Sequence, residues 1–152
     1  MATLVEILTK SETRPRVVRA CAELVAAEVE SKRGLSGVAV KAGYKLVVAV
    51  KPSMVSDVVD KLLPEFAEAM GPFYAASVEE AARNRRPVAH TFADHLVAEG
   101  DAVADALLAV TDRRAEKASG PLLKAYRRLR STAKEHVKAA VPGLARTIAP
   151  FT

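Results

Sequence analysis

Apolar residues recur at steps of three and four along most of the chain, the spacing that places side chains on one face of an α-helix. The pattern predicts helices over residues 3–9, 15–31, 53–70, 77–86, 87–99, 101–116 and 121–141. The last of these has the most regular stripe, formed by Leu122, Tyr126, Leu129, Ala133, Val137, Ala140 and Val141. We therefore expect an all-α fold, a single compact domain over residues 1–152 with about six or seven helices on one core.

Proline and glycine mark the expected ends of these helices. Pro64 is expected to kink or split the 53–70 helix, and Gly71-Pro72 to end it. Residues 73–74, Phe and Tyr, would then form a turn with their rings in the core, and Ser77 with Glu80 would cap the 77–86 helix. In the same way, Pro142-Gly143 is expected to end the last helix, and residues 117–120 to form the loop before it.

The segment 38–50 fits two secondary structures. Its alternate residues from Val38 to Val50 are mostly apolar, as in a strand, and a strand or hairpin remains an alternative. However, the intervening residues Ala39, Val47 and Ala49 are apolar as well, and Lys41 and Lys45 are one helical turn apart. We interpret the segment as a buried helix, central in the bundle. Its wide apolar arc would otherwise need a partner, which could be a second copy in a homodimer or an acyl chain.

Composition agrees with a helical, self-sufficient domain. Half of the residues are apolar, aromatic residues make up 5%, and tryptophan is absent. The single cysteine, Cys21, excludes an internal disulfide, and its place in an apolar stripe predicts a raised thiol pKa and low reactivity. There is no cleavable leader pattern, and no apolar stretch approaches the roughly 20 residues of a spanning helix. We expect a cytoplasmic protein that is not an integral membrane protein.

Positive charge is concentrated near the C-terminus. Residues 1–112 carry 13 basic and 16 acidic side chains, and residues 113–152 carry 10 basic and 2 acidic ones, so the net charge of +5 belongs to the last quarter. The last helix displays the cations Lys124, Arg127, Arg128, Arg130, Lys134 and Lys138. They could form a solvated face partly paired with acidic residues of the same molecule. They could also bind nucleic acid, anionic lipid or an acidic protein.

Histidines offer the one hint of metal or enzyme chemistry. His90 and Asp94 are one helical turn apart, which suits two metal ligands or a histidine oriented by a carboxylate. Further ligands would have to come from another helix, where Asp57, Asp60, Glu65 and Glu68 are the candidates. No nucleophile on a strained turn and no glycine-rich phosphate loop is recognisable. We therefore predict no cofactor and favour a surface or half-buried histidine beside a helix-stabilising aspartate.

The chain resembles a family of small, uncharacterised bacterial helical proteins. The matching stretches are Ser36-Gly37 through Val40–Lys45 to Val50-Lys51-Pro52, then Pro72-Phe73-Tyr74, and Ala104–Asp112 leading to Arg113. These are packing and turn residues, so the resemblance implies a helical fold and a bacterial origin and carries over no catalytic residue. Together the patterns predict a non-enzymatic binding or interaction protein, with a protein partner or self-association at the basic last helix or at an apolar groove beside residues 38–50. The alternative function is a metal-dependent enzyme centred on His90 and Asp94.

Overall fold

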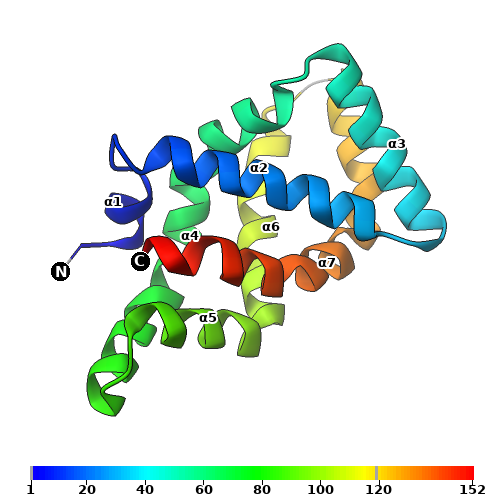
Figure 1. The fold of residues 1–152 in the computed structure, drawn as a ribbon. Helices are drawn as coiled ribbons and strands as arrows, with labels where there is room; N and C mark the ends of the chain where they lie inside the picture. Colours follow the sequence, from blue (N-terminus) through cyan, green and yellow to red (C-terminus); the bar gives the residue numbers. More distant parts are fainter. Residues whose placement is uncertain (1, 119) are drawn as a thin grey trace.

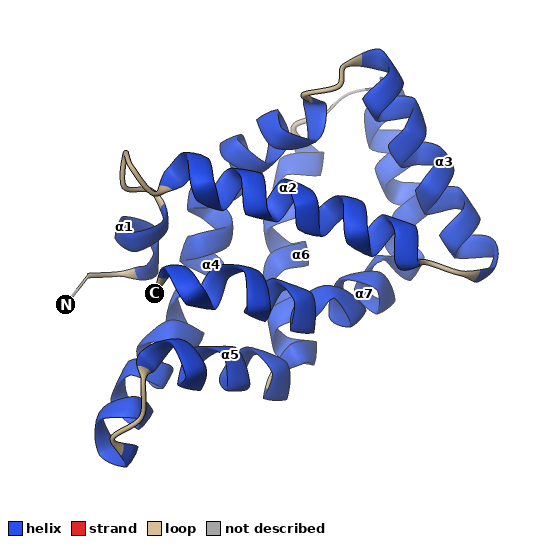
Figure 2. Cartoon of the chain, in the orientation of Figure 1, coloured by secondary structure: helices blue, strands red, loops and turns tan. Residues whose placement is uncertain are grey.

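The described part of the chain folds into seven α-helices and one terminal 3-10 turn (Figures 1 and 2). A computed structural model describes residues 2–118 and 120–152, with the side chains of residues 121 and 122 left out. The elements are α1 (Leu4–Leu8), α2 (Arg14–Ser31), α3 (Gly34–Val50), α4 (Met54–Asn84), α5 (Val88–Ala98), α6 (Gly100–Glu116), α7 (Gly120–Ile148) and η1 (Ala149–Phe151). The all-α prediction is confirmed, and the strand alternative for residues 38–50 is wrong, because that segment is helical.

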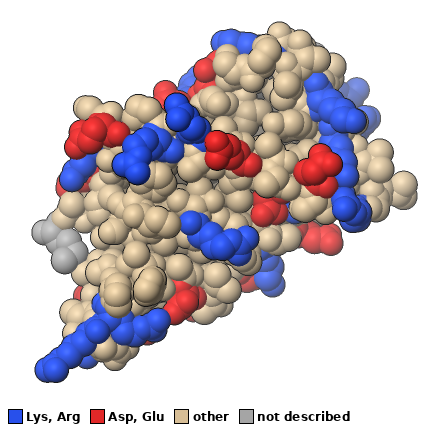
Figure 3. Space-filling model, viewed as in Figure 1, with Lys and Arg blue, Asp and Glu red and all other residues tan. Residues whose placement is uncertain are grey.

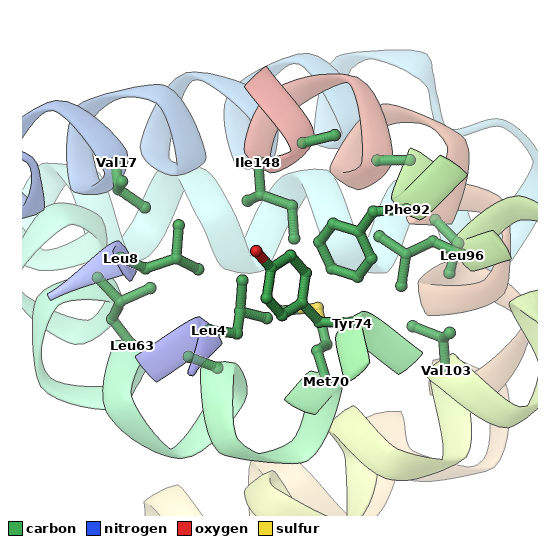
Figure 4. Packing of buried hydrophobic residues seen from close by; sticks show 14 residues of the cluster. Leu4, Leu8, Val17, Leu63, Met70, Tyr74, Phe92, Leu96, Val103 and Ile148 are labelled. Atoms are coloured by element: carbon green, nitrogen blue, oxygen red, sulfur yellow. The ribbon is translucent and has the colours of Figure 1, made fainter. Parts of the chain in front are cut away.

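The core lies where α1, α2, α4, α5, α6 and the end of α7 meet. Leu4 and Leu8 from the short α1 are buried in it beside Val17 of α2 (Figure 4). The rings of Tyr74 and Phe92 pack edge to face, with centroids 5.2 Å apart. Within the described residues, α3 contributes no side chain to this buried cluster.

Helix α4 runs unbroken through both positions expected to interrupt it. Pro64 and Pro72 lie inside the helix, and Gly71 does not end it. Each proline removes one helical hydrogen bond, but neighbouring buried side chains such as Leu63 and Met70 hold the helix on the core. Tyr74 does reach the core, as predicted, although from a helix and not from a turn.

The predicted capping box at Ser77 is wrong. Ser77 is fully buried inside α4, and its hydroxyl donates to the carbonyl oxygen of Phe73, 2.7 Å away. A serine hydroxyl can donate a hydrogen bond to the backbone carbonyl one turn earlier in the same helix, so a serine does not by itself mark the start of a helix. The 53–70 and 77–86 segments are consequently one helix that ends at Asn84.

Helix α7 also continues past its expected end. Pro142 lies within it, and the flanking Val141 and Ala145 are buried in the core. Figure 1 shows α7 changing direction between its light-orange first part and its darker end, and it remains one helix across Pro142. The expected 117–120 loop includes Ser119, which lies outside the described residues, and so does the Leu122 side chain of the predicted stripe.

No helix in the described part of the chain combines the length and the apolar character needed to cross a bilayer.

Candidate functional site

The most unusual surface of the molecule is the side of α3 that points away from the other helices. Residues 38–50 form a helix, as predicted, but the expectation of a buried, central helix is wrong. Its large apolar side chains are strongly exposed: Leu35 by 92%, Val50 by 74%, Leu46 by 67% and Val38 by 65%. Helix α3 lies at the edge of the molecule and packs against α2 and α4 near its ends (Figure 1).

Helical geometry gathers these exposed residues into one surface. At about 100° per residue, the arc that faces solvent carries Leu35, Val38, Ala39, Ala42, Leu46, Ala49 and Val50, which we call the outer face of α3. The opposite arc carries Gly37, which is buried, and Val40, Tyr44 and Val48, which are half-buried. The outer face contains no polar side chain. A helix that is apolar on both sides normally belongs in an interior or at a membrane.

Cations border the outer face. The segment 32–51 contains five lysine or arginine residues and no acidic residue. Lys32 is paired with Glu28, with their charged atoms 3.7 Å apart, and Lys51 with Asp57 at 2.9 Å. Among the described residues, no carboxylate pairs with Lys41 or Lys45. In Figure 3, basic side chains follow the edge of the molecule where α3 lies, with uncharged atoms beyond them.

The basic helix predicted as a contact face is α7, and α6 neutralises half of it. Arg130 binds the carboxylate of Asp112, Lys134 lies between Asp101 and Asp105, and Lys138 is 3.6 Å from Asp101. Hydrogen bonds from these cations hold the pKa values of Asp112 and Asp101 below their ordinary range. For these three cations the structure therefore favours the solvated, internally paired face.

The other three predicted cations are Lys124, Arg127 and Arg128, and all are exposed. Within the described residues, no acidic side chain pairs with them. Tyr126, the aromatic residue nearest to them in sequence, donates its hydroxyl to Asp112 at 2.5 Å and is half-buried. Its ring is therefore held by α6 and not presented for stacking on a base. What remains of the predicted face is a small cationic surface without an aromatic platform.

The structure does not bring the candidate metal ligands together. His90 and Asp94 are exposed on α5, and Asp94 is paired with Arg86, with the nitrogen and oxygen 3.0 Å apart. Of the candidate further ligands, Asp57 pairs with Lys51, Asp60 with Arg14 and Glu65 with Arg114. In the described part of the chain, no three histidine, cysteine or acidic side chains come together in a metal-binding group.

An apolar cavity of about 220 Å³ lies between α2, α4, α6 and α7. Its wall is formed by Cys21, Leu24, Val25, Val59, Leu63, Phe66, Met70, Leu107, Leu108, Thr111, Val137, Leu144 and Ile148. None of these residues belongs to α3, so this is not the groove expected beside residues 38–50. A wider groove open to solvent runs along α2 and the start of α4, next to the Arg14–Asp60 ion pair.

The apolar cavity has a wall of buried and part-buried side chains. Leu63, Met70, Leu108 and Ile148 are buried, and the other wall residues are part-buried, so the cavity is open to the surface on one side. Burial in this wall raises the pKa of the Cys21 thiol to about 11, which agrees with the inert cysteine expected from the sequence.

Comparison with known proteins places the chain in a family but assigns it no activity. A family model matches residues 4–152, nearly the whole chain. The chain belongs to DUF6918, a family of unknown function. No curated protein and no solved structure matches it. The resemblance to an uncharacterised family is thus confirmed, and any functional statement has to come from the chain itself.

The exposure of α3 and the apolar cavity were not predicted from the sequence. The exposure of α3 could not be predicted from its composition, because a mostly apolar helix has the same composition whether it is covered or exposed. The apolar cavity is built by residues from four helices that are far apart in sequence. The pairing of Arg130 with Asp112 had one usable signal, since the acidic 101–112 segment precedes a basic helix after a short connection.

Proposed function

We propose that this protein is a non-enzymatic binding protein that docks by the outer face of α3 onto an anionic lipid surface. The observation that carries the proposal is the exposure of Leu35, Leu46 and Val50 on a helix without polar residues on that face. The predicted protein-interaction role at the basic helix becomes secondary, because α6 pairs with half of its cations. Bacterial origin and a cytoplasmic location stay predictions.

The outer face of α3 leaves apolar side chains in water that a partner would cover. Fully burying one leucine or valine side chain is worth roughly 1.5–3 kcal/mol. The four large side chains of the outer face leave most of that free energy unused while they face water. Contiguous apolar surface of this kind marks sites of protein or membrane contact.

The charges beside the outer face favour an anionic lipid surface over a second copy of the chain. Two copies packed by this face would bring Lys45 and Lys41 of both chains close to the same seam, with no acidic residue of segment 32–51 to balance them. An anionic bilayer supplies the missing negative charge, and each lysine near such a surface contributes about 1 kcal/mol of attraction. Lysine side chains can also extend past an apolar surface to reach headgroups.

The position of α3 in the fold also favours contact with a membrane surface. Helix α3 lies at the edge of the molecule, where a flat surface can approach it along its length (Figure 1). Its 17 residues span about 26 Å at 1.5 Å per residue. A helix of this length can lie in the plane of a membrane with its apolar side at the headgroup boundary.

Vesicle binding tests the proposal. The wild-type chain should co-sediment with phosphatidylglycerol vesicles, and much less with phosphatidylcholine vesicles. The double variant Leu46→Gln with Val50→Gln should bind at least tenfold more weakly, because it removes apolar contact without changing charge. Lys41→Gln with Lys45→Gln should weaken binding and reduce its sensitivity to salt.

A matched control places the same substitutions elsewhere. Val58 on α4 and Val97 on α5 are 45% and 51% exposed, so Val58→Gln with Val97→Gln changes equivalent side chains outside α3. This control should bind vesicles like the wild type. Failure of the wild type to bind anionic vesicles would contradict the proposal. So would equal weakening of binding by Leu46→Gln with Val50→Gln and by the control Val58→Gln with Val97→Gln. A dimer in sedimentation velocity that the α3 variant disperses, without vesicle binding, would point to a second copy instead.

A further inference from the structure

We infer that the apolar cavity between α2, α4, α6 and α7 is a binding site for one small, neutral, apolar molecule, such as a short hydrocarbon chain. This site is separate from the outer face of α3, since no α3 residue lines it. The inference therefore does not depend on docking at a membrane. Its ligand class follows from the wall, the volume and the partners of the few polar groups present.

The wall offers a ligand almost nothing but carbon and sulfur. Among the described residues, Thr111 supplies the only hydroxyl of the wall. This hydroxyl donates to the carbonyl oxygen of Leu108, 3.0 Å away, and its oxygen lies 2.8 Å from the hydroxyl oxygen of Tyr126. The Cys21 thiol stays protonated at neutral pH, because burial disfavours the thiolate. No charged side chain of the described part of the chain lines the cavity. A charged or strongly polar ligand would lose its hydration here without compensation.

Water is a poor occupant for the same reason. A buried water needs two to four polar partners, and this wall provides at most the lone pairs of a hydroxyl that is already bonded. Apolar cavities of about 150 Å³ stay dry and are large enough to hold benzene. At about 220 Å³, this cavity can hold benzene or a somewhat larger molecule.

The location of the cavity gives a ligand firm contacts and a way in. Leu63, Met70 and Ile148 are buried and form the inner part of the wall. Most other wall residues, among them Val59 and Val137, are only part-buried, so the cavity opens towards the surface. A small molecule can therefore reach it without unfolding of the core.

Calorimetry and thermal unfolding with defined probes test the inference. The purified full chain, without vesicles, is titrated with toluene and with 1-octanol, and octanoate serves as the charged counterpart of the second probe. We expect one equivalent of a neutral probe to bind and to raise the unfolding temperature. Octanoate should bind at least tenfold more weakly than 1-octanol, because its carboxylate finds no partner.

A larger side chain in the wall should fill the cavity and abolish binding of the neutral probes. Val59→Phe adds a ring to the wall and should weaken neutral probe binding at least tenfold. Val58→Phe, the same change at the adjacent exposed position of α4, should bind like the wild type. If Val59→Phe does not fold, Cys21→Met fills the wall from α2 with a flexible side chain and gives the same test.

Cys21 provides an independent readout of location. It is the one cysteine of the chain and a wall residue, so a bound neutral probe should slow its modification by a small thiol reagent. Absence of neutral probe binding to the wild type would overturn the inference. So would equal binding by the wild type and the filled variants, since the probe would then sit elsewhere. Neither outcome bears on vesicle binding by α3, so the two proposals fail separately.

Discussion

Arg130 on α7 binds Asp112 on α6 through two hydrogen bonds, from Nε to Oδ1 at 2.9 Å and from Nη2 to Oδ2 at 3.2 Å. The hydroxyl of Tyr126 donates to the same carboxylate, 2.5 Å away. This carboxylate therefore joins two positions of α7 to the end of α6. Part of the positive charge of α7 stabilises the fold and is not available to a partner.

Replacing Asp112 with asparagine should lower the free energy of unfolding by up to about 1 kcal/mol, the usual range for a part-exposed ion pair. The pKa of Asp112 is lowered in the folded state, so its contribution is present above the ordinary carboxyl pKa and is lost as the pH falls through the depressed value. Urea unfolding at pH 7 and at pH 3 measures this. The difference between wild type and variant should shrink in acid; an undiminished difference would contradict the assignment.

The paired and unpaired cations of α7 should differ in their effect on polyanion binding. If duplex DNA binds at low salt, charge reversal of Arg127 and Arg128 to glutamate should weaken it more than charge reversal of Lys134 and Lys138. The first two residues are exposed without acidic partners among the described residues, whereas α6 already neutralises the second pair. A filter-binding titration at several salt concentrations compares the two variants. Equal losses would mean that the internal pairs open on binding.

The Cys21 thiol should react slowly near neutral pH. Its pKa of about 11, against an ordinary value of 9.0, leaves a thiolate fraction about 100-fold smaller at pH 8. The same shift stabilises the folded state below pH 9, and this contribution is lost as the pH rises towards 11. Iodoacetamide labelling from pH 7 to 11 measures the thiolate, and Cys21→Ala should remove part of the alkaline loss of stability. Rapid labelling of the folded chain at pH 8 would contradict the burial.

Two glycines of α3 should respond in opposite directions to alanine. A methyl group at Gly43 meets no atom within 4 Å, so Gly43→Ala should stabilise the helix by about 1 kcal/mol through helix propensity. At Gly37 the new methyl group would lie 2.9 Å from the backbone carbon of Lys32, so Gly37→Ala should displace the start of α3. Amide exchange across α3 compares the two variants, and faster exchange in Gly43→Ala than in the wild type would be the wrong sign.

Periodicity was sufficient to predict the helical class, and most helices begin and end near their expected residues. The errors concern proline and glycine, which act locally, whereas helix continuity depends on packing. Pro72 and Pro142 each cost a hydrogen bond, but the buried Tyr74 and Ala145 nearby hold their helices on the core. That gain comes from helices distant in sequence and is not visible in a local pattern.

The candidate sites were less predictable than the fold. The sequence shows that Lys134 is basic, but its pairing with Asp101 and Asp105 depends on how α6 and α7 cross. His90 and Asp94 have the right spacing on one helix, yet a ligand set needs a second helix to approach them, and Arg86 already binds Asp94. Spacing within one helix fixes which residues share a side and does not fix what faces them.

The outward side chains of α3 contact the surroundings and take no part in the core that stabilises the fold. Since its outward side chains support no buried neighbour, they can be exchanged with little penalty to folding. Selection can therefore retune what this molecule adheres to by changing Leu35, Leu46 or Val50 while the scaffold stays intact. The same independence makes α3 a convenient place to engineer a new recognition surface.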